Sequence, residues 1–209
     1  MLAALSSACY GGVVTSLPGG TVVPIPADND DEISGPVVFD GITWTATGGV
    51  GYFGFTSTWG FGTNGEWTGA LGPMAGVDDE TDSMTFAPSS PVSGIGGFLN
   101  WATPDYGTAT IAVYDTSDVL IESDVLSFST GGADDTGQFL GFSEGSADIG
   151  YFTLTGAYIG ITDLTVSGEV SAVPEPGAVG LTLIGLGLLV SMRKRMVTRR
   201  HSAQGTRSA

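Results

Sequence analysis

The sequence predicts an all-β protein, an antiparallel β-sandwich of the jelly-roll kind, followed by a single C-terminal transmembrane helix. Three observations favour this architecture. Short runs rich in β-branched residues recur between turns made of Gly, Asp and Ser. Before the C-terminal segment, no stretch of about ten residues keeps a helical hydrophobic period without a glycine interruption. Near the C-terminus, an uncharged run at residues 177–192 is followed directly by basic residues.

The 209 residues suit one domain with additional segments at both ends. The single cysteine cannot form an internal disulfide, and it excludes a zinc cluster built on cysteines. Composition divides the chain into five parts, which we expect to be an apolar, signal-peptide-like segment (1–26), an acidic, proline-containing lead-in (27–36), the β-sandwich (37–170), a segment with the uncharged run and basic cluster (171–196), and a basic tail (197–209).

The strand pattern predicts one hairpin with particular clarity. Residues 110–114 and 119–123 are rich in β-branched residues, and the four residues between them, Asp115 to Asp118, have side chains that bond to a local turn backbone. Residues 149–155 and 159–166 are predicted to form a second strand pair. Further strands are expected at residues 37–39, 42–45, 83–86, 95–99 and 138–142.

Charge is segregated along the chain. All six Lys and Arg residues lie from Arg193 onward, whereas all 22 acids lie between Asp28 and Glu175, and the one histidine is His201. The missing cations exclude nucleic-acid binding and argue against phosphoryl transfer. Without histidine, the body cannot use a histidine-activated nucleophile or an imidazole metal site. Carboxylates, hydroxyls, amides and aromatic rings remain, and these suit hard-cation binding, sugar binding or a two-carboxylate glycosidase.

The N-terminal segment resembles the end of a secretory signal peptide. Leu2 to Leu5 is apolar and is followed by the small residues Ser6, Ser7 and Ala8, although the positively charged start typical of such signals is missing. We therefore expect an upstream start or a trimmed segment. Cys9 follows directly, but the leucine expected three positions before a lipid-attachment cysteine is absent. We therefore expect an incidental cysteine near a cleavage site, with lipid attachment as the alternative.

The C-terminal uncharged run predicts a membrane anchor. As a helix, residues 177–192 would reach about 24 Å, somewhat short of a hydrocarbon core of ~30 Å. Snorkelling of the following arginines and local thinning of the bilayer would close that gap. The alternative is a buried core helix. The basic flank favours the anchor, and the positive-inside rule places the basic tail in the cytoplasm and the acidic body outside.

The same region resembles a known sorting signal. Pro174-Glu175-Pro176, the glycine- and leucine-rich run at 177–192 and the basic cluster Arg193-Lys194-Arg195 are similar in kind and order to the PEP-CTERM signal of exopolysaccharide-producing Gram-negative bacteria. The resemblance implies a substrate of an exosortase, held in the inner membrane and processed for the cell surface or extracellular matrix. The tail after Arg195 is longer than is usual in the family.

The body also resembles the β-sandwich ectodomains that often carry this signal. The resemblance rests on Met84-Thr85-Phe86, residues 91–98, the hairpin that follows, residues 138–142 and the final run at 161–165. It implies a jelly roll and identifies no ligand. We therefore expect an exported structural or adhesive component of an exopolysaccharide or biofilm.

Two acidic clusters are candidate metal sites. Asp78, Asp79, Glu80 and Asp82 lie within five positions before a predicted strand, and Ca²⁺ prefers carboxylate and carbonyl oxygens. The spacing does not fit an EF-hand, because the turn glycine and the twelfth-position Glu are missing. The alternative is a solvated acidic loop. The second cluster consists of Asp28, Asp30, Asp31 and Glu32.

Aromatic residues give a second candidate site, for carbohydrate stacking. Trp59 and Trp67 flank a glycine-rich loop and are the strongest candidates. Trp44 lies in an alternating strand and is expected in the core, and Trp101, Tyr52 and Tyr106 are further candidates. An alternative function is thus a calcium-dependent carbohydrate-binding module. A glycosidase is a more distant alternative, and Glu66, beside Trp67, is its first candidate carboxylate.

Overall fold

A computed structural model describes residues 11–28, 30–48, 51–56, 72–102, 106–126, 138–156 and 158–168. All of them belong to one unit, Met1–Ser171. No helix within these ranges is long and apolar enough to cross a bilayer. The expected cleavage region, Cys9, the motif Pro174–Pro176, the anchor at 177–192 and the basic cluster Arg193–Arg195 lie outside the described residues.

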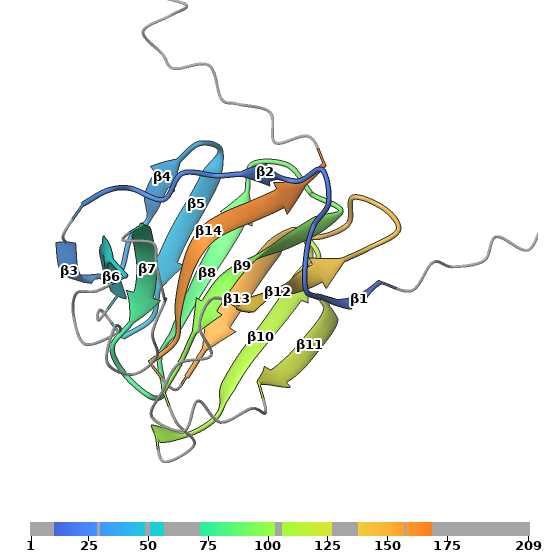
Figure 1. The fold of residues 1–209 in the computed structure, drawn as a ribbon. Helices are drawn as coiled ribbons and strands as arrows, with labels where there is room; N and C mark the ends of the chain where they lie inside the picture. Colours follow the sequence, from blue (N-terminus) through green and yellow to red (C-terminus); the bar gives the residue numbers. More distant parts are fainter. Residues whose placement is uncertain are drawn as a thin grey trace, which may run out of the picture. The chain divides into compact units, whose positions relative to one another are not determined.

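Two antiparallel sheets make up the fold, and we call them sheet A and sheet B. Sheet A contains β1 (Gly12–Val14), β2 (Thr21–Val22), β3 (Asp30–Ile33), β6 (Gly51–Phe55), β7 (Pro73–Val77), β9 (Gly94–Asn100), β12 (Gln138–Ser143) and β14 (Gly160–Ser167). Its strand order is β1-β12-β9-β14-β7-β6-β3, with β2 paired to β14 (Figure 1). Sheet B contains β4 (Val37–Phe39), β5 (Ile42–Ala46), β8 (Ser83–Pro88), β10 (Ala109–Tyr114), β11 (Leu120–Leu126) and β13 (Tyr151–Thr155), in the order β11-β10-β13-β8-β5-β4.

One hydrophobic core lies between the two sheets. In β13, for example, Phe152 and Leu154 are fully buried, while the alternate residues Tyr151, Thr153 and Thr155 are partly exposed. This is the period-2 pattern of a strand with one face in the core. Aromatic contacts join the two sheets. The ring centroids of Phe152 and Phe142 lie 6.2 Å apart, and those of Trp44 and Phe53 lie 4.6 Å apart. The expected all-β sandwich is thus confirmed, and Trp44 lies in its core as predicted.

The hairpin predicted at 110–123 is confirmed as β10 and β11, paired antiparallel. Its turn is held by the Asp115 carboxylate, whose Oδ1 accepts hydrogen bonds from the amides of Ser117 (2.7 Å) and Val119 (2.9 Å). Asp118 takes a positive φ of 62°, which Asp tolerates better than most residues. A short acidic side chain therefore determines this turn locally.

The predicted pairing of residues 149–155 with 159–166 is wrong, although both strands exist. β13 lies in sheet B between β10 and β8, whereas β14 lies in sheet A beside β9 and β7. The turn at Gly156 (φ 80°) and Tyr158 (φ 53°) carries the chain from one sheet to the other. Two strands paired in one sheet and two strands in opposite sheets show the same alternation of buried and exposed residues. Here β13 and β14 lie in opposite sheets, and their inward residues, such as Leu154 and Ile161, are buried in the common core. From β8 onward the chain changes sheet repeatedly in this way.

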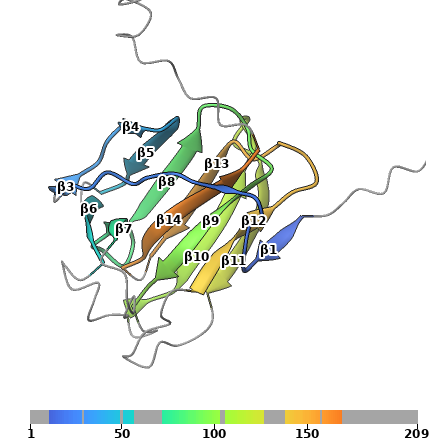
Figure 2. The ribbon, with the colours of Figure 1, turned by 45° about the horizontal axis from the view of Figure 1, so that its top comes forward.

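The sandwich starts earlier than the expected boundary at residue 37. β1 pairs with β12, β2 with β14 and β3 with β6, and Figure 2 shows β1 at the edge beside β12. Val23 and Ile25 are buried, and the amide of Val23 donates to the carbonyl oxygen of Leu164 at 2.7 Å. Residues 11–26, which were expected to belong to a signal-peptide-like segment, thus contribute β1, β2 and part of the core, and the expected lead-in at 27–36 contributes β3.

Candidate functional site

Three connections meet at one end of the sandwich, around the acidic loop 78–82 that joins β7 to β8. The amide of Gly156, in the connection from β13 to β14, donates to the carbonyl oxygen of Asp82 at 2.8 Å. A β-carbon on Gly156 would lie 2.5 Å from the carbonyl oxygen of Thr108, in the connection from β9 to β10. Glycine at 156 therefore permits this close approach, which brings the candidate calcium loop beside two other turns.

Within this loop the carboxylates have separate partners. Asp78 is exposed and accepts a hydrogen bond from the hydroxyl of Tyr52 at 2.9 Å. Asp79 Oδ1 accepts from the amide of Thr81 at 2.8 Å and from its hydroxyl at 2.7 Å. The carboxylate of Asp82 lies against Gly48, in the turn after β5. Each side chain thus faces a different neighbour.

The pKa values of this loop follow those contacts. The hydroxyl and the amide of Thr81 lower the pKa of Asp79, because both stabilise the ionised carboxylate. Partial burial, followed by the negative charge of Asp79, raises the pKa of Asp82. Within the described ranges, no group of three or more His, Cys, Asp or Glu side chains is placed to hold a metal. Calcium binding by Asp78, Asp79, Glu80 and Asp82 stays a prediction.

Two tyrosines lie beside the same loop. The ring of Tyr106, which is 47% exposed, makes a T-shaped contact of 5.5 Å with the ring of Tyr158. Burial raises the pKa of Tyr158, and the negative charges of Asp78 and Glu80 raise it further. Tyr106 is a candidate on sequence grounds, whereas Tyr158 is not. The position of Tyr158 in a turn shortly after a strand is the signal that could have identified it.

The other aromatic candidates divide into buried residues and residues that are not described. Trp101 is 3% exposed and Tyr52 is 7% exposed, so neither offers a ring face to a sugar. Trp59, Trp67 and Glu66 lie outside the described residues. In the second acidic cluster, Asp28 and Glu32 are exposed, Asp30 and Asp31 belong to β3, and the side chains of these last two are not described.

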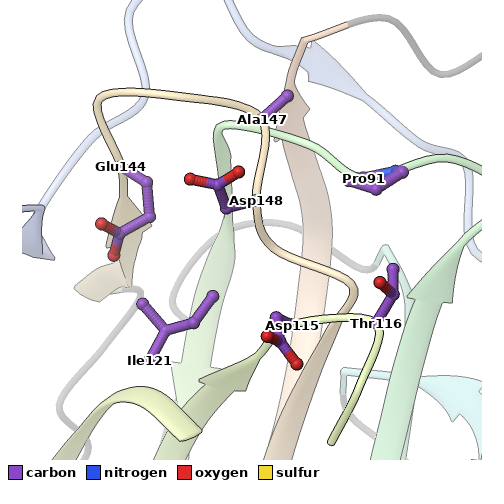
Figure 3. Close-up of a pocket in the computed structure, with 7 residues that line it drawn as sticks. All are labelled: Pro91, Asp115, Thr116, Ile121, Glu144, Ala147 and Asp148. Carbon is purple, nitrogen blue, oxygen red and sulfur yellow. The ribbon is translucent and has the colours of Figure 1, made fainter. Parts of the chain in front are cut away.

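A pocket with a volume of about 390 Å³ lies among the connections at the other end of the strands. It is lined by residues of the β10–β11 turn, β11, the β12–β13 connection and the segment before β9: Pro91, Asp115, Thr116, Ile121, Glu144, Ala147 and Asp148. Figure 3 shows Glu144 and Asp148 on one side and Asp115 and Thr116 on the other. None of these residues was singled out from sequence as a site.

Two of the three carboxylates in this pocket serve local structure. Asp115 holds the hairpin turn through the amides of Ser117 and Val119. Asp148 accepts a hydrogen bond from the hydroxyl of Ser146, two residues before it. The pocket therefore has a negative potential that attracts cations, but these two carboxylates are engaged in the turns that carry them.

Glu144 is the exception in this pocket. Its Oε1 is buried and has no hydrogen-bond partner among the described residues. Its carboxylate lies against the backbone of Gly11, where a β-carbon would overlap it. Burial raises the pKa of Glu144, and the charge of Glu122 adds to this effect; the Gly11 amide lowers it, and Asp148 raises it further. The ionised carboxylate therefore destabilises the folded chain.

Glu144→Gln is expected to stabilise the protein at pH 7. Because the pKa of Glu144 is raised in the folded state, its destabilising effect is full above that raised value. The effect declines as the pH falls towards the ordinary pKa of glutamate, and it disappears below it. We expect a Tm a few degrees above the wild-type value at pH 7 and no difference near pH 4, measured by thermal unfolding.

Asp28→Asn is the matched control for this prediction, because it removes one negative charge at an exposed position. It should change Tm less than Glu144→Gln does. Equal stabilisation by both variants would show that the overall negative charge, rather than the surroundings of Glu144, is responsible.

Comparison with known proteins identifies no family. No family model and no curated protein matches the chain. Among solved structures, the chain is similar to the Family 11 carbohydrate-binding module of the cellulosomal cellulase Lic26A-Cel5E of Clostridium thermocellum, at 11% identity and a TM-score of 0.20. The match covers 69% of this chain and 97% of that one. A similarity at this level supports no conclusion about the ligand.

Proposed function

We propose that this protein is exported and sorted to the cell surface or extracellular matrix of a Gram-negative bacterium, where its β-sandwich has a structural or adhesive role in exopolysaccharide or biofilm. The observation that carries the proposal is the segregation of charge. All six Lys and Arg residues follow the uncharged run at 177–192, and the body before it has none. This is the distribution expected of a domain outside a membrane with a short cytoplasmic tail.

In this proposal the C-terminal segment acts as a substrate and not as a catalyst. Pro174, Glu175 and Pro176 are the residues that an exosortase recognises, residues 177–192 form the single transmembrane helix, and Arg193, Lys194 and Arg195 stop translocation. The prolines favour an extended backbone that a processing enzyme can bind. The repeated change of sheet from β8 to β14 supports jelly-roll connectivity for the exported body.

We assign the body no enzymatic activity. A two-carboxylate glycosidase needs one acid to donate a proton and a second to act as base or nucleophile. In the pocket at Glu144, the carboxylates of Asp115 and Asp148 accept local hydrogen bonds. This arrangement supports a structural role for those two acids.

Intact mass spectrometry of the protein from its native cells tests the proposal. The expected product lacks the N-terminal residues up to about Ala8 and is cut near Pro174–Pro176, because the signal-like segment and the anchor are both removed. Deleting residues 177–209 should release the body from the membrane fraction. An uncut chain dissolved in the cytosol would contradict the proposal.

The second candidate function is a calcium-dependent carbohydrate-binding module. The T-shaped pair of Tyr106 and Tyr158 beside the loop 78–82 favours it, because a sugar can stack on an exposed tyrosine ring while carboxylates bind its hydroxyls. Sugar binding that a chelator abolishes would distinguish this function from the structural one.

A further inference from the structure

The outward face of sheet B is formed by uncharged side chains. Strand register defines it: in β8 and β13 the inward residues are fully buried, so Thr85 and Thr153, which pair with one another, point outward. The same argument applied to all six strands gives the face, which we call the outer face of sheet B: Val38, Thr43, Thr45, Ser83, Thr85, Ala87, Thr110, Ala112, Tyr114, Leu120, Ser123, Val125, Tyr151, Thr153 and Thr155.

None of these side chains carries a charge, although the chain has 22 acids. The absence of charge on this face does not arise because the strands of sheet B lack acids, as β11 shows. Its two acids, Glu122 and Asp124, pair with Val113 and Ile111, whose side chains point into the core. The acids are therefore on the inward side at the rim of the sandwich, while Val125, 55% exposed, is on the outer face.

This arrangement reverses the usual pattern of a half-buried strand, in which apolar residues face inward and charged residues face solvent. Leu120, in the same strand, is 50% exposed, and Val38, at the opposite edge of the sheet, is 68% exposed. A face that only contacts water would be expected to carry charged side chains. The exposed apolar side chains and the absence of charge therefore suggest that this face contacts a partner.

Hydroxyl groups recur across this face in register. One row follows Thr45, Thr85, Thr153, Ala112 and Ser123 from β5 to β11, with about 4.8 Å between neighbouring strands. In the next row, Tyr151 pairs with Tyr114, and their rings stack at 4.8 Å with an interplanar angle of 12°. Both tyrosines are partly exposed.

The charge of the body decides between the occupants of such a face. A second copy of the chain, or an anionic polymer, would bring negative charge towards a body that contains most of the chain's 22 acids and no cation. A neutral polysaccharide brings none. Its alternating hydroxyl and C–H groups match threonine side chains, each with one hydroxyl and one methyl group, and its rings pack against tyrosine.

We propose that the outer face of sheet B binds a neutral polysaccharide chain. This inference rests on the proposed adhesive role for its biological setting and adds the class of the partner and the surface that binds it. It is separate from the calcium-dependent alternative, because none of the strand residues that form the outer face is a carboxylate. At the end of the face, the hydroxyl of Tyr151 donates to the carboxylate of Asp118 in the turn between β10 and β11.

Affinity electrophoresis of the full-length chain in nonionic detergent tests the inference, with hydroxyethylcellulose as the neutral probe and alginate as the anionic one. The neutral probe should retard the chain, alginate should not, and EDTA should have no effect. Thr85→Glu and Thr85→Lys should each weaken binding at least about fivefold, because a charge at the centre of the face must be desolvated.

Thr21→Glu and Thr21→Lys are the matched controls, since Thr21 is exposed on β2 of sheet A, and they should bind like the wild type. If the Thr85 variants unfold, Ser123→Glu places the charge in the same row on the exposed strand β11. The inference would be overturned if hydroxyethylcellulose did not retard the chain, or if EDTA abolished the retardation. It would also be overturned if Thr85→Lys alone bound the probe more strongly, or if the Thr21 variants lost as much affinity as the Thr85 variants. Sorting is measured separately in cells, so either result can fail without the other.

Discussion

Glu175→Gln is expected to leave the full-length chain in the inner membrane and to remove most of it from the cell surface. The substitution keeps the size of the side chain and both prolines of the Pro174–Pro176 motif but removes its single charge. A hydrogen bond to a charged group contributes about 1.5–3 kcal/mol, so recognition by the processing enzyme should fall roughly tenfold or more. Cell fractionation followed by immunoblotting against the body measures both pools.

Glu169→Gln is the matched control, because it makes the same change six positions earlier in the chain. It should be delivered like the wild type. Normal surface delivery of Glu175→Gln would count against recognition of the motif, and equal retention of both variants would point to a general effect of charge near the membrane.

Phe152→Ala is expected to destabilise the sandwich by about 3–5 kcal/mol, because it removes a fully buried ring and leaves a cavity. Phe152 lies on β13, pairs with Phe86 within sheet B and contacts the ring of Phe142 across the core at 6.2 Å. Typical domains are stable by only 5–15 kcal/mol. Urea unfolding of the full-length chain in detergent should therefore show a much lower midpoint.

Val22→Ala provides the comparison, since Val22 is 54% exposed at the edge of the fold. Its effect should stay below about 0.5 kcal/mol. If Phe152→Ala had a similarly small effect, the two sheets would not share the tightly packed core described here.

The strands could be predicted where local chemistry is sufficient. The hairpin at 110–123 depends on β-branched residues and on Asp115, whose side chain bonds to amides two and four residues away. By contrast, β6 and β7 were not recognised, because glycines interrupt the first and Pro73 begins the second. Proline is tolerated there because it is the first residue of its strand.

The pairing of strands could not be predicted in the same way. An alternating run such as 151–155 tells which residues point inward, but a neighbour in the same sheet and a strand in the opposite sheet bury that face equally well. The turn at Gly156 and Tyr158 decided the matter for β13 and β14. For the same reason, the sequence did not predict that Val23 and Ile25 belong to the core. Their burial depends on pairing with β14, which is far away in the chain.

The candidate sites show a similar division. Sequence identified the loop 78–82 as acidic, but only the structure placed Tyr106 and Tyr158 beside it and gave its carboxylates separate partners. Neither the pocket at Glu144 nor the uncharged outer face of sheet B was predicted. Each is assembled from residues of several strands or turns, and no local pattern marks such an assembly.

By itself, the sequence determined the all-β class, the segregation of charge and the absence of any cation in the body, because composition and residue order are properties of the covalent chain. Only the tertiary structure decided which strands are neighbours, that the N-terminal segment completes sheet A, and that the acids of β11 point away from the outer face of sheet B. These features depend on register and on which sheet a strand joins, and both are selected by burial of the common core rather than by the residues of any single strand.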